Sequence, residues 1–287
     1  MLNLSTISTK KEGLLEKFSD SERTSVIYHD LFDYPLNFQD LIKWHSGKNA
    51  TTIKRTGKVT SKRGFYFLEG REGLIYKKLL RKRISAKKIK IADNAAKILS
   101  FVPGVKMVAV TGSLAMENSS EDSDIDLMIV TKRGLLWTTR LLAYTAVRLF
   151  GIQTRNPGMG EQKNKLCLNI WLDERDLNWP KGDRNIYTAH EIAQIIPIVN
   201  KGRTYEMFLM ENKWILNFWP NAVRINKKLN ANPSSFPFFP LSLIEKFAFK
   251  LQYQYMKNKL TREVITPTRA LFHPQDWARV VLGRLTA

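Results

Sequence analysis

The sequence predicts an α+β fold built from several parts. Three apolar segments, at residues 105–111, 123–131 and 165–173, have the length and composition of buried strands. In the segments before and after them, apolar residues recur mostly at helical spacing. The central strands are therefore expected to form a sheet, with helices supplied by the flanking parts of the chain.

The first part of the chain contains two short predicted helices and a strand. Between residues 21 and 45, apolar side chains recur at helical spacing, with a break at Asp33-Tyr34-Pro35. Asn37 is suited to be the N-cap of the second helix. A basic connection then leads to the aromatic strand Gly64-Phe65-Tyr66-Phe67-Leu68. This order predicts a winged-helix-like module over residues 1–75, although no third helix is evident.

The remaining parts follow from changes in composition along the chain. Residues 76–103 predict a basic linker helix that becomes Ala-rich towards its end. The three strands belong to a core at residues 104–180, where residues 135–150 have helical spacing. Residues 181–287 predict a helical C-terminal region.

The charge balance favours a partner that carries phosphate. Lys and Arg total 46 against 26 Asp and Glu, which gives a formal net charge of +20 and is typical of proteins that bind polyanions. The basic residues gather at 48–63 and 77–90. A solvated helix face and an exposed loop explain such runs as well as RNA or DNA binding does. Charge alone therefore leaves both interpretations open.

Other classes of function do not fit the composition. The sequence lacks a run of about 18 apolar residues, so we expect no membrane span. It begins without the apolar segment of a secretion signal, and we expect a cytoplasmic location. One cysteine, Cys167, and 4 His residues do not suit a zinc site. Any bound metal is therefore expected to have oxygen ligands.

The clearest chemistry lies in one strand–turn–strand stretch. A strand ends at Gly112-Ser113, and after a spacer of ten residues a second strand opens with Asp124 and Asp126. Because side chains alternate along a strand, both carboxylates point to one face and can hold the same cation. Gly112 allows a ligand to approach the backbone, and Ser113 offers donors to phosphate oxygens. The stretch predicts an Mg²⁺ (or Mn²⁺) site at Asp124 and Asp126 beside a phosphate-binding turn.

This combination of a Gly-Ser turn, a ten-residue spacer and an Asp-x-Asp strand resembles the signature of the polymerase-β nucleotidyltransferase superfamily. Stretches such as 32–36, 136–140, 190–192 and 272–274 resemble one poorly characterised bacterial and archaeal branch of it. The resemblance implies a mixed-sheet nucleotidyltransferase core with an N-terminal winged-helix-like module and a C-terminal helical region. It also implies transfer of a nucleoside monophosphate from a nucleoside triphosphate to an acceptor hydroxyl, with Mg²⁺ (or Mn²⁺).

The sequence departs from the superfamily pattern at Asn169. Active members usually carry a third carboxylate on the third core strand, and an amide there binds metal through its oxygen but accepts no proton. Asp173 has the same parity as Asn169 but lies about 13 Å further along a straight strand. Glu117 and Glu121 are interpreted as exposed loop acids. The alternative to an enzyme is therefore a catalytically inactive nucleotide sensor or nucleic-acid-binding protein.

Four other polar residues are weaker candidates for a role in the site. Arg140, early in the helix after the second strand, is within reach of a bound triphosphate, as are Lys132 and Lys165, although an ordinary surface role is the alternative for each. His190 is interpreted as structural, because His-Glu without a second His is not a zinc-protease motif.

Overall fold

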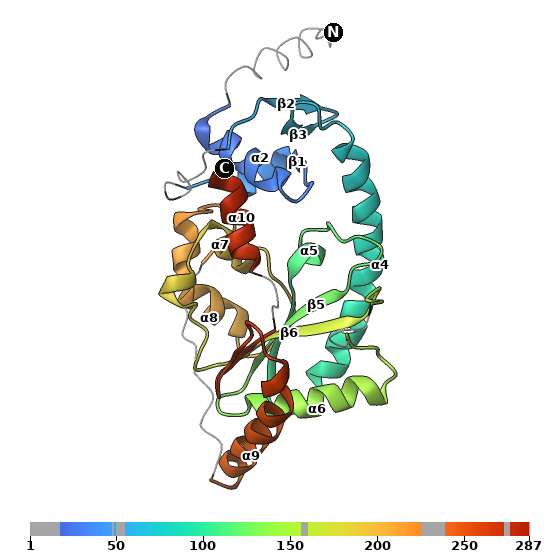
Figure 1. Cartoon of the computed structure of the whole chain (residues 1–287), viewed down its shortest axis with the longest axis vertical. Coiled ribbons are helices and arrows are strands. Elements are labelled where there is room, and N and C mark those ends of the chain that lie inside the picture. The colour runs from blue at the N-terminus through green and yellow to red at the C-terminus, as the bar shows by residue number, and fades with distance from the viewer. Residues whose placement is uncertain are drawn as a thin grey trace, which may run out of the picture.

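A six-stranded sheet lies at the centre of the molecule, with helices on both faces (Figure 1). The computed structural model describes residues 18–47, 49, 55–155, 160–225, 239–272 and 276–286. In spatial order the strands are β7 (Ile196–Asn200), β4 (Val105–Val110), β5 (Ile125–Thr131), β6 (Leu166–Asp173), β9 (Arg269–Leu271) and β8 (Val264–Ile265). β5 and β6 are parallel and the other neighbours are antiparallel. The predicted α+β fold with a mixed sheet is therefore confirmed, but β7, β9 and β8 come from residues 181–287, for which the sequence predicted a helical region.

The two faces of the sheet are buried by different sets of helices. On β5, Leu127 and Ile129 point into a layer shared with three long helices, and Met128 and Val130 point into the opposite layer. The long helices are α4 (Leu74–Ser100), α6 (Leu136–Leu149) and α9 (Phe239–Met256). A strand buried on both faces needs apolar residues at successive positions. This double burial explains why the central strands are nearly continuous apolar runs in the sequence.

The opposite layer is formed by shorter helices from both ends of the chain. They are α2 (Asp20–Asp30), α3 (Phe38–Lys43), α7 (Ile186–Ala193), α8 (Thr204–Glu211), the 3-10 helix η3 (Lys213–Asn217) and α10 (Trp277–Thr286). The remaining helical turns are α5 (Gly112–Ala115), η2 (Lys181–Asp183) and η4 (Lys257–Lys259). Over the described ranges of the chain, no helix is long and apolar enough to cross a membrane.

The N-terminal elements include a small antiparallel sheet. β1 (Leu36–Asn37), β2 (Val59–Lys62) and β3 (Phe65–Leu68) pair in the order β1-β3-β2. Asn37 caps α3 as expected: its side chain accepts the Asp40 N–H, and the Asp40 carboxylate accepts the Asn37 N–H. A third helix of a winged-helix-like module would fall between α3 and β2, where residues 48 and 50–54 lie outside the described residues.

A cluster of buried aromatic rings joins the N-terminal elements to the C-terminal half. The Trp219 ring makes edge contacts with Tyr28 and Trp44, with centroids 5.0 and 5.7 Å away. The His190 ring stacks on Trp44 at 4.0 Å. Its Nε2 lies 3.1 Å from Nε2 of His29. Because α2, α7 and Trp44 at the end of α3 contribute rings to one cluster, these elements are expected to unfold together.

Trp219→Ala tests this shared core. Trp219 is fully buried, and its indole N–H donates to the Ile186 carbonyl at 3.1 Å, so truncation leaves a large cavity and an unpaired carbonyl. We expect the free energy of unfolding to fall by about 3–5 kcal/mol, in one cooperative transition measured by urea denaturation. Phe101→Ala removes a ring that is 86% exposed and serves as the control. An unchanged midpoint for Trp219→Ala would contradict the shared core.

Candidate functional site

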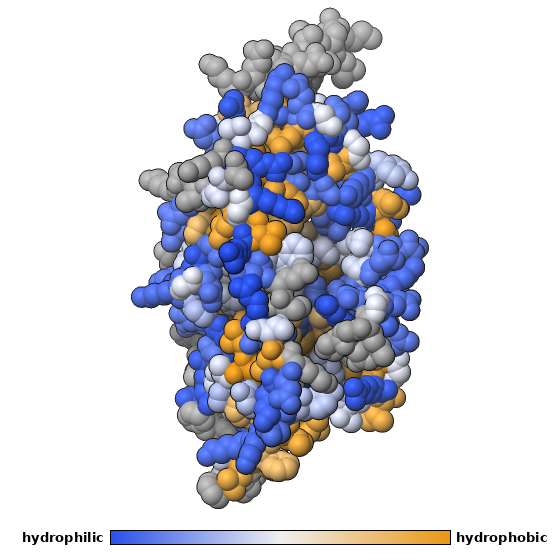
Figure 2. All heavy atoms as spheres, viewed as in Figure 1, coloured by the Kyte–Doolittle hydropathy of each residue, from blue (hydrophilic) through white to orange (hydrophobic). Residues whose placement is uncertain are grey.

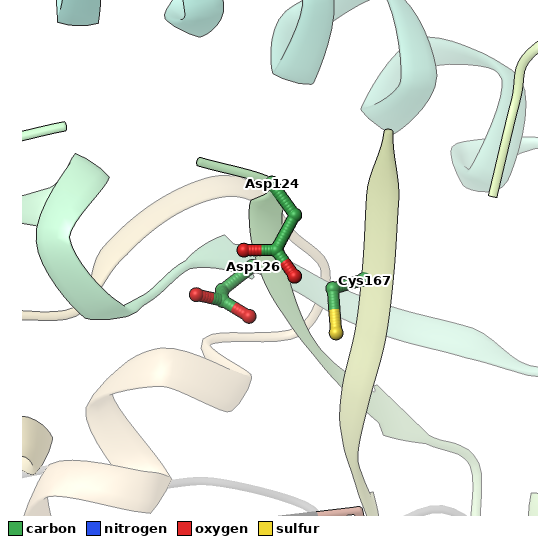
Figure 3. A group of neighbouring side chains, drawn as sticks. All are labelled: Asp124, Asp126 and Cys167. Carbon is green, nitrogen blue, oxygen red and sulfur yellow. The ribbon is translucent and has the colours of Figure 1, made fainter. Parts of the chain in front are cut away.

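Asp124 and Asp126 lie side by side at the beginning of β5 (Figure 3). One carboxylate oxygen from each lies within 4.8 Å of the other and of the Cys167 Sγ on β6. The position of the thiol follows from strand pairing, because Asp126 is opposite Cys167 in the parallel β5–β6 ladder. Two carboxylates at this separation repel each other unless a cation lies between them. The structure thus brings together the two acids that the sequence singled out.

Asn169 is placed beside Asp126 by an irregularity in β6. Leu168 and Ile170 pair with consecutive residues of β5, so Asn169 is an extra residue between them. Such a bulge redirects a side chain and inverts the alternation beyond it. The Asn169 Nδ2 donates to Asp126 Oδ1 at 2.7 Å. Its Oδ1 is buried and has no hydrogen-bond partner in the described parts of the chain.

Asp173 does not share the face of Asn169, and the parity argument for it is wrong. Past the bulge the alternation is reversed, so Trp171 packs in the same layer as Leu168. Asp173 lies two residues after Trp171 on the strand, so it points to the same side, and it is fully buried. It accepts the Gly134 N–H at 2.7 Å and pairs with Arg175 at 2.8 Å. Its carboxylate therefore stabilises the fold away from Asp124 and Asp126.

The loop acids Glu117 and Glu121 are exposed, as the sequence suggested. Glu117 pairs with Lys82 at 3.3 Å, and Glu121 pairs with Lys163 at 2.8 Å. Surface pairs of this kind contribute little stability. Neither carboxylate lines the cavity that contains Asp124 and Asp126.

The loop that leads into Asp124 is held by polar residues of α4. Lys88 is 2% exposed, and its ammonium group donates to the carbonyls of Glu121 and Ser123 at 3.1 and 2.5 Å. The Ser85 hydroxyl accepts the Ser119 N–H at 3.1 Å. Part of the basic run in the sequence is therefore buried and structural, which the charge pattern alone did not distinguish from a solvated face.

The turn at Gly112 is built so that only glycine fits against Asp126. Gly112 has φ +60°, and a Cβ there would lie 2.7 Å from Asp126 Oδ2. The Thr111 N–H donates to the Asp126 carbonyl at 3.1 Å and ties the turn to β5. Ser113 follows with an exposed side chain whose Oγ lies 3.4 Å from that of Ser119. The turn and the acid pair thus belong to one site.

The turn and the acids open on a cavity of about 550 Å³ between the sheet and helices α2, α7 and α10. This volume is in the range of small-molecule sites. Its polar wall contains Gly112, Ser113, Asp124, Asp126, Asn169, Arg155, Thr111, Asn118 and Gln162. The rest of the wall consists of His29, Phe32, Tyr34, Met116, Ile170, Tyr187, His190, Glu191, Gln194, Phe272 and Trp277.

Arg155 is a site residue that the sequence did not reveal. Its Nη1 lies 3.1 Å from Asp124 Oδ2 and 3.8 Å from the Cys167 Sγ. A bridge between Thr154 and Leu166 brings the segment beside the start of β6. Arg155 belongs to no motif, and only the tertiary structure places it next to Asp124.

The structure does not place Arg140 at the cavity. Its guanidinium Nη1 donates to Gln252 Oε1 at 2.6 Å, and its Cζ lies 4.8 Å from the ring centres of Tyr144 and Phe272. It is thus packed between α6 and α9, and Arg155 occupies the position beside the acids. Lys132 and Lys165 do not line the cavity either.

The environment of Asp126 favours its neutral form in the absence of a cation. Burial, followed by repulsion from Asp124, raises the pKa of Asp126 from 3.8 to about 7, against the opposing effects of Cys167 and Arg155. Burial also raises the pKa of the Cys167 thiol, which therefore stays protonated. Across the cavity, burial and Asp126 raise the pKa of Glu191 from 4.5 to about 8. The acidic groups together favour a bound cation.

The residues present suit a hard divalent metal ion. Asp124 and Asp126 offer carboxylate oxygens, and the unpartnered Asn169 Oδ1 offers a third oxygen. Mg²⁺ and Mn²⁺ prefer such ligands, whereas soft metals are bound by a thiolate, and the Cys167 thiol stays protonated.

His190 is buried in the aromatic cluster, as the structural interpretation requires, although its edge lines the cavity. The His29 Nδ1 lies 2.8 Å from the Ser25 carbonyl, which only accepts, so a neutral His29 presents an unprotonated Nε2 to His190. Burial lowers the pKa of both rings, that of His29 to about 4. Both imidazoles are therefore neutral near pH 7.

Comparison with known proteins agrees with this geometry. Residues 92–197 match the family model of the nucleotidyltransferase domain. No curated protein gives a significant match. Among solved structures, a chain in a crystal structure of the toxin-antitoxin with AMP-PNP is 12% identical, with a TM-score of 0.26, covering 58% of this chain and 96% of that chain. At that TM-score the likeness supports no statement about this chain. The family match spans β4 to the second residue of β7 and includes both acids, so residues 92–197 are a nucleotidyltransferase domain.

Proposed function

We propose that the protein transfers a nucleoside monophosphate from a nucleoside triphosphate to an acceptor hydroxyl, with Mg²⁺ (or Mn²⁺). The observation that carries the proposal is the convergence of the Gly112-Ser113 turn, the acid pair and Asn169 on one cavity. A scaffold without a ligand gains nothing from two adjacent, partly buried carboxylates, because they repel each other. The match to the nucleotidyltransferase domain supports the same reaction class.

The polar wall has the groups that a triphosphate needs. Asp124, Asp126 and the Asn169 Oδ1 would hold the divalent ion, which when bound would neutralise charge on the triphosphate and on the departing pyrophosphate. Gly112 leaves room for phosphate oxygens close to the backbone, and Ser113 presents an exposed hydroxyl. Arg155, now paired with Asp124, is placed to contact phosphate once the carboxylate binds the cation.

The remaining wall suits a nucleoside. Phe32 and Tyr187 lie with their rings nearly parallel, at 19° and 6.5 Å between centroids, and both line the cavity. Tyr34, Phe272 and Trp277 add further aromatic surface. Aromatic faces stack on any base, so this wall accounts for binding of a nucleoside without selecting one.

One exposed face of α4 supports a polyanionic acceptor such as RNA or DNA. Arg83, Lys87 and Lys90 are exposed and recur at spacings of four and three residues, which places them on the same side of the helix. Figure 2 shows mostly hydrophilic side chains on this view of the molecule, with hydrophobic ones visible around α10 and near the end of α6. The basic face of α4 attracts phosphate backbones without regard to nucleotide sequence. The order of α2, β1, α3, β2 and β3 supports a winged-helix-like module beside it.

A nucleotide sensor is the second candidate, and Asn169 is the observation that favours it. An amide in this position neither adds negative charge to attract the cation nor accepts a proton. A sensor would bind a nucleoside triphosphate with Mg²⁺ in the same cavity and release no pyrophosphate. Binding and transfer must therefore be measured separately.

Exchange of both acids for amides is expected to abolish transfer. Wild-type protein is incubated with each labelled nucleoside triphosphate and Mg²⁺, with total RNA or the protein itself as acceptor, and compared with Asp124→Asn/Asp126→Asn. We expect the loss to exceed about 100-fold, because both negative charges that attract the cation are gone. Glu117→Gln/Glu121→Gln removes two exposed carboxylates from the same loop and is expected to leave transfer unchanged. Transfer that survives in the double Asp variant would refute the site assignment.

Mg²⁺ binding is expected to depend on pH through Asp126. Since burial and Asp124 raise the pKa of this carboxyl group to about 7, protons compete with the cation below that pH. Affinity measured by calorimetry should be level above about pH 8 and weaken about tenfold per pH unit below about pH 7. Glu117→Gln should show the same profile. Level affinity down to about pH 5.5 would mean that Asp126 is not a ligand.

The same pKa predicts how the metal-free protein responds to pH. The folded state holds the Asp126 proton between pH 3.8 and about 7, where the unfolded chain has lost it. This group therefore favours folding at low pH, and its contribution is lost as the pH rises through about 7.

A further inference from the structure

A third acidic side chain reaches the cavity from outside the strands of the core. Glu191 lies on α7, in the layer on the side of the sheet that carries Met128 and Val130. Asp126 has the same parity on β5 as these residues, so its carboxylate points to the same side. Both acids line the cavity of about 550 Å³. Glu191 therefore faces the site where the cation and the triphosphate would lie.

The carboxyl group of Glu191 is held at one oxygen and left open at the other. The Gln194 amide, itself 4% exposed, donates to Oε1 at 2.8 Å. In the described parts of the chain, Glu191 Oε2 has no hydrogen-bond partner, and this oxygen is not fully buried. One oxygen thus fixes the orientation of the group, and the other is available to a molecule in the cavity.

The surroundings of Glu191 make it a stronger proton acceptor than an ordinary carboxylate. Asp126 on β5 acts on it by repulsion and the Gln194 amide by a hydrogen bond that opposes the rise, while burial and Glu191 together raise the pKa of Tyr187 on the same helix and of Tyr28 on α2. Burial and Asp126 raise the pKa of Glu191 to about 8. A base whose pKa lies near the working pH combines a useful ionised fraction with a strong tendency to take up a proton.

Other groups in this part of the cavity are less suited to accept a proton. Tyr187 has a pKa raised by burial and by Glu191, so it stays protonated. His190 lies next to Glu191 in sequence, but its ring is hydrogen-bonded to His29 and stacked on Trp44. Burial also lowers the pKa of His190 well below the ordinary value. Asn169 has no proton-accepting group. Glu191 is thus the suitable base on this wall.

We propose that Glu191 is the catalytic base of the transfer reaction and replaces the carboxylate that position 169 lacks. The inference rests on the proposed function. The acceptor oxygen forms a bond to the α-phosphorus while its proton passes to Glu191 Oε2. The bond between the α-phosphorus and the bridging oxygen breaks, and pyrophosphate leaves with the electron pair. α7 thereby completes the site of the nucleotidyltransferase domain.

Glu191→Gln tests the proposal, since it keeps the size of the side chain and removes the proton acceptor. Label transfer is measured at saturating nucleoside triphosphate and saturating Mg²⁺ over a range of pH, and Mg²⁺-dependent nucleotide binding is measured by calorimetry. We expect the rate to fall at least about 100-fold, while the nucleotide Kd changes less than about twofold. The wild-type rate should rise with pH up to about 8, and the residual rate of Glu191→Gln should not.

Two further variants serve as controls. Glu191→Asp keeps the base but shortens the side chain, so it should recover part of the lost rate and of the pH dependence. Glu211→Gln makes the same exchange at an exposed position on α8 and should behave as wild type. Nucleotide binding by Glu191→Gln, together with an unchanged circular dichroism spectrum, shows that the variant is folded.

The outcomes separate this inference from the proposed function. Wild-type transfer that Glu191→Gln leaves within about threefold would overturn the inference alone. Loss of nucleotide or Mg²⁺ binding in parallel with the rate would also overturn it, because Glu191 would then be a ligand. A wild-type protein that binds nucleotide with Mg²⁺ but transfers nothing would overturn the proposed function and this inference with it.

Discussion

The mutual repulsion of Asp124 and Asp126 is the constraint on which the rest of the site depends. Their oxygens lie within 4.8 Å of each other at the start of a buried strand. Without a cation, the protein relieves the repulsion by pairing Asp124 with Arg155 and by raising the pKa of Asp126 to about 7. A divalent ion relieves it more completely, because it attracts both groups at once. The pair is therefore a site prepared for a ligand.

The surrounding elements are fitted to this pair. Gly112 leaves the space against Asp126 that any Cβ would occupy. The extra residue in β6 turns Asn169 towards Asp126, and Lys88 fixes the loop in front of Asp124. Ligand groups on strands and on short, anchored turns keep their geometry better than groups on free loops. The wall opposite the pair is contributed by α2, α7 and α10.

Sequence patterns predicted the local parts of this arrangement and missed the distant ones. The turn, the spacer and the alternation of Asp124 and Asp126 are set by neighbouring residues, so they could be deduced from their order. The bulge at Asn169 depends on pairing with β5, and a single extra residue was enough to invert the deduced face of Asp173. Arg155 and Glu191 reach the site only through tertiary packing. No motif marks either residue, although Glu191 lies in a stretch that carried the family resemblance.

The central claim is that one divalent ion binds between Asp124, Asp126 and the Asn169 Oδ1. Anomalous scattering from a crystal grown with Mn²⁺ and a non-hydrolysable nucleoside triphosphate tests it most directly. The account predicts a Mn²⁺ peak within about 2.3 Å of oxygens from all three side chains, with the triphosphate against Gly112 and Ser113. A triphosphate bound in the cavity with no metal peak at the acid pair, or with Asp126 turned away from the ion, would contradict it.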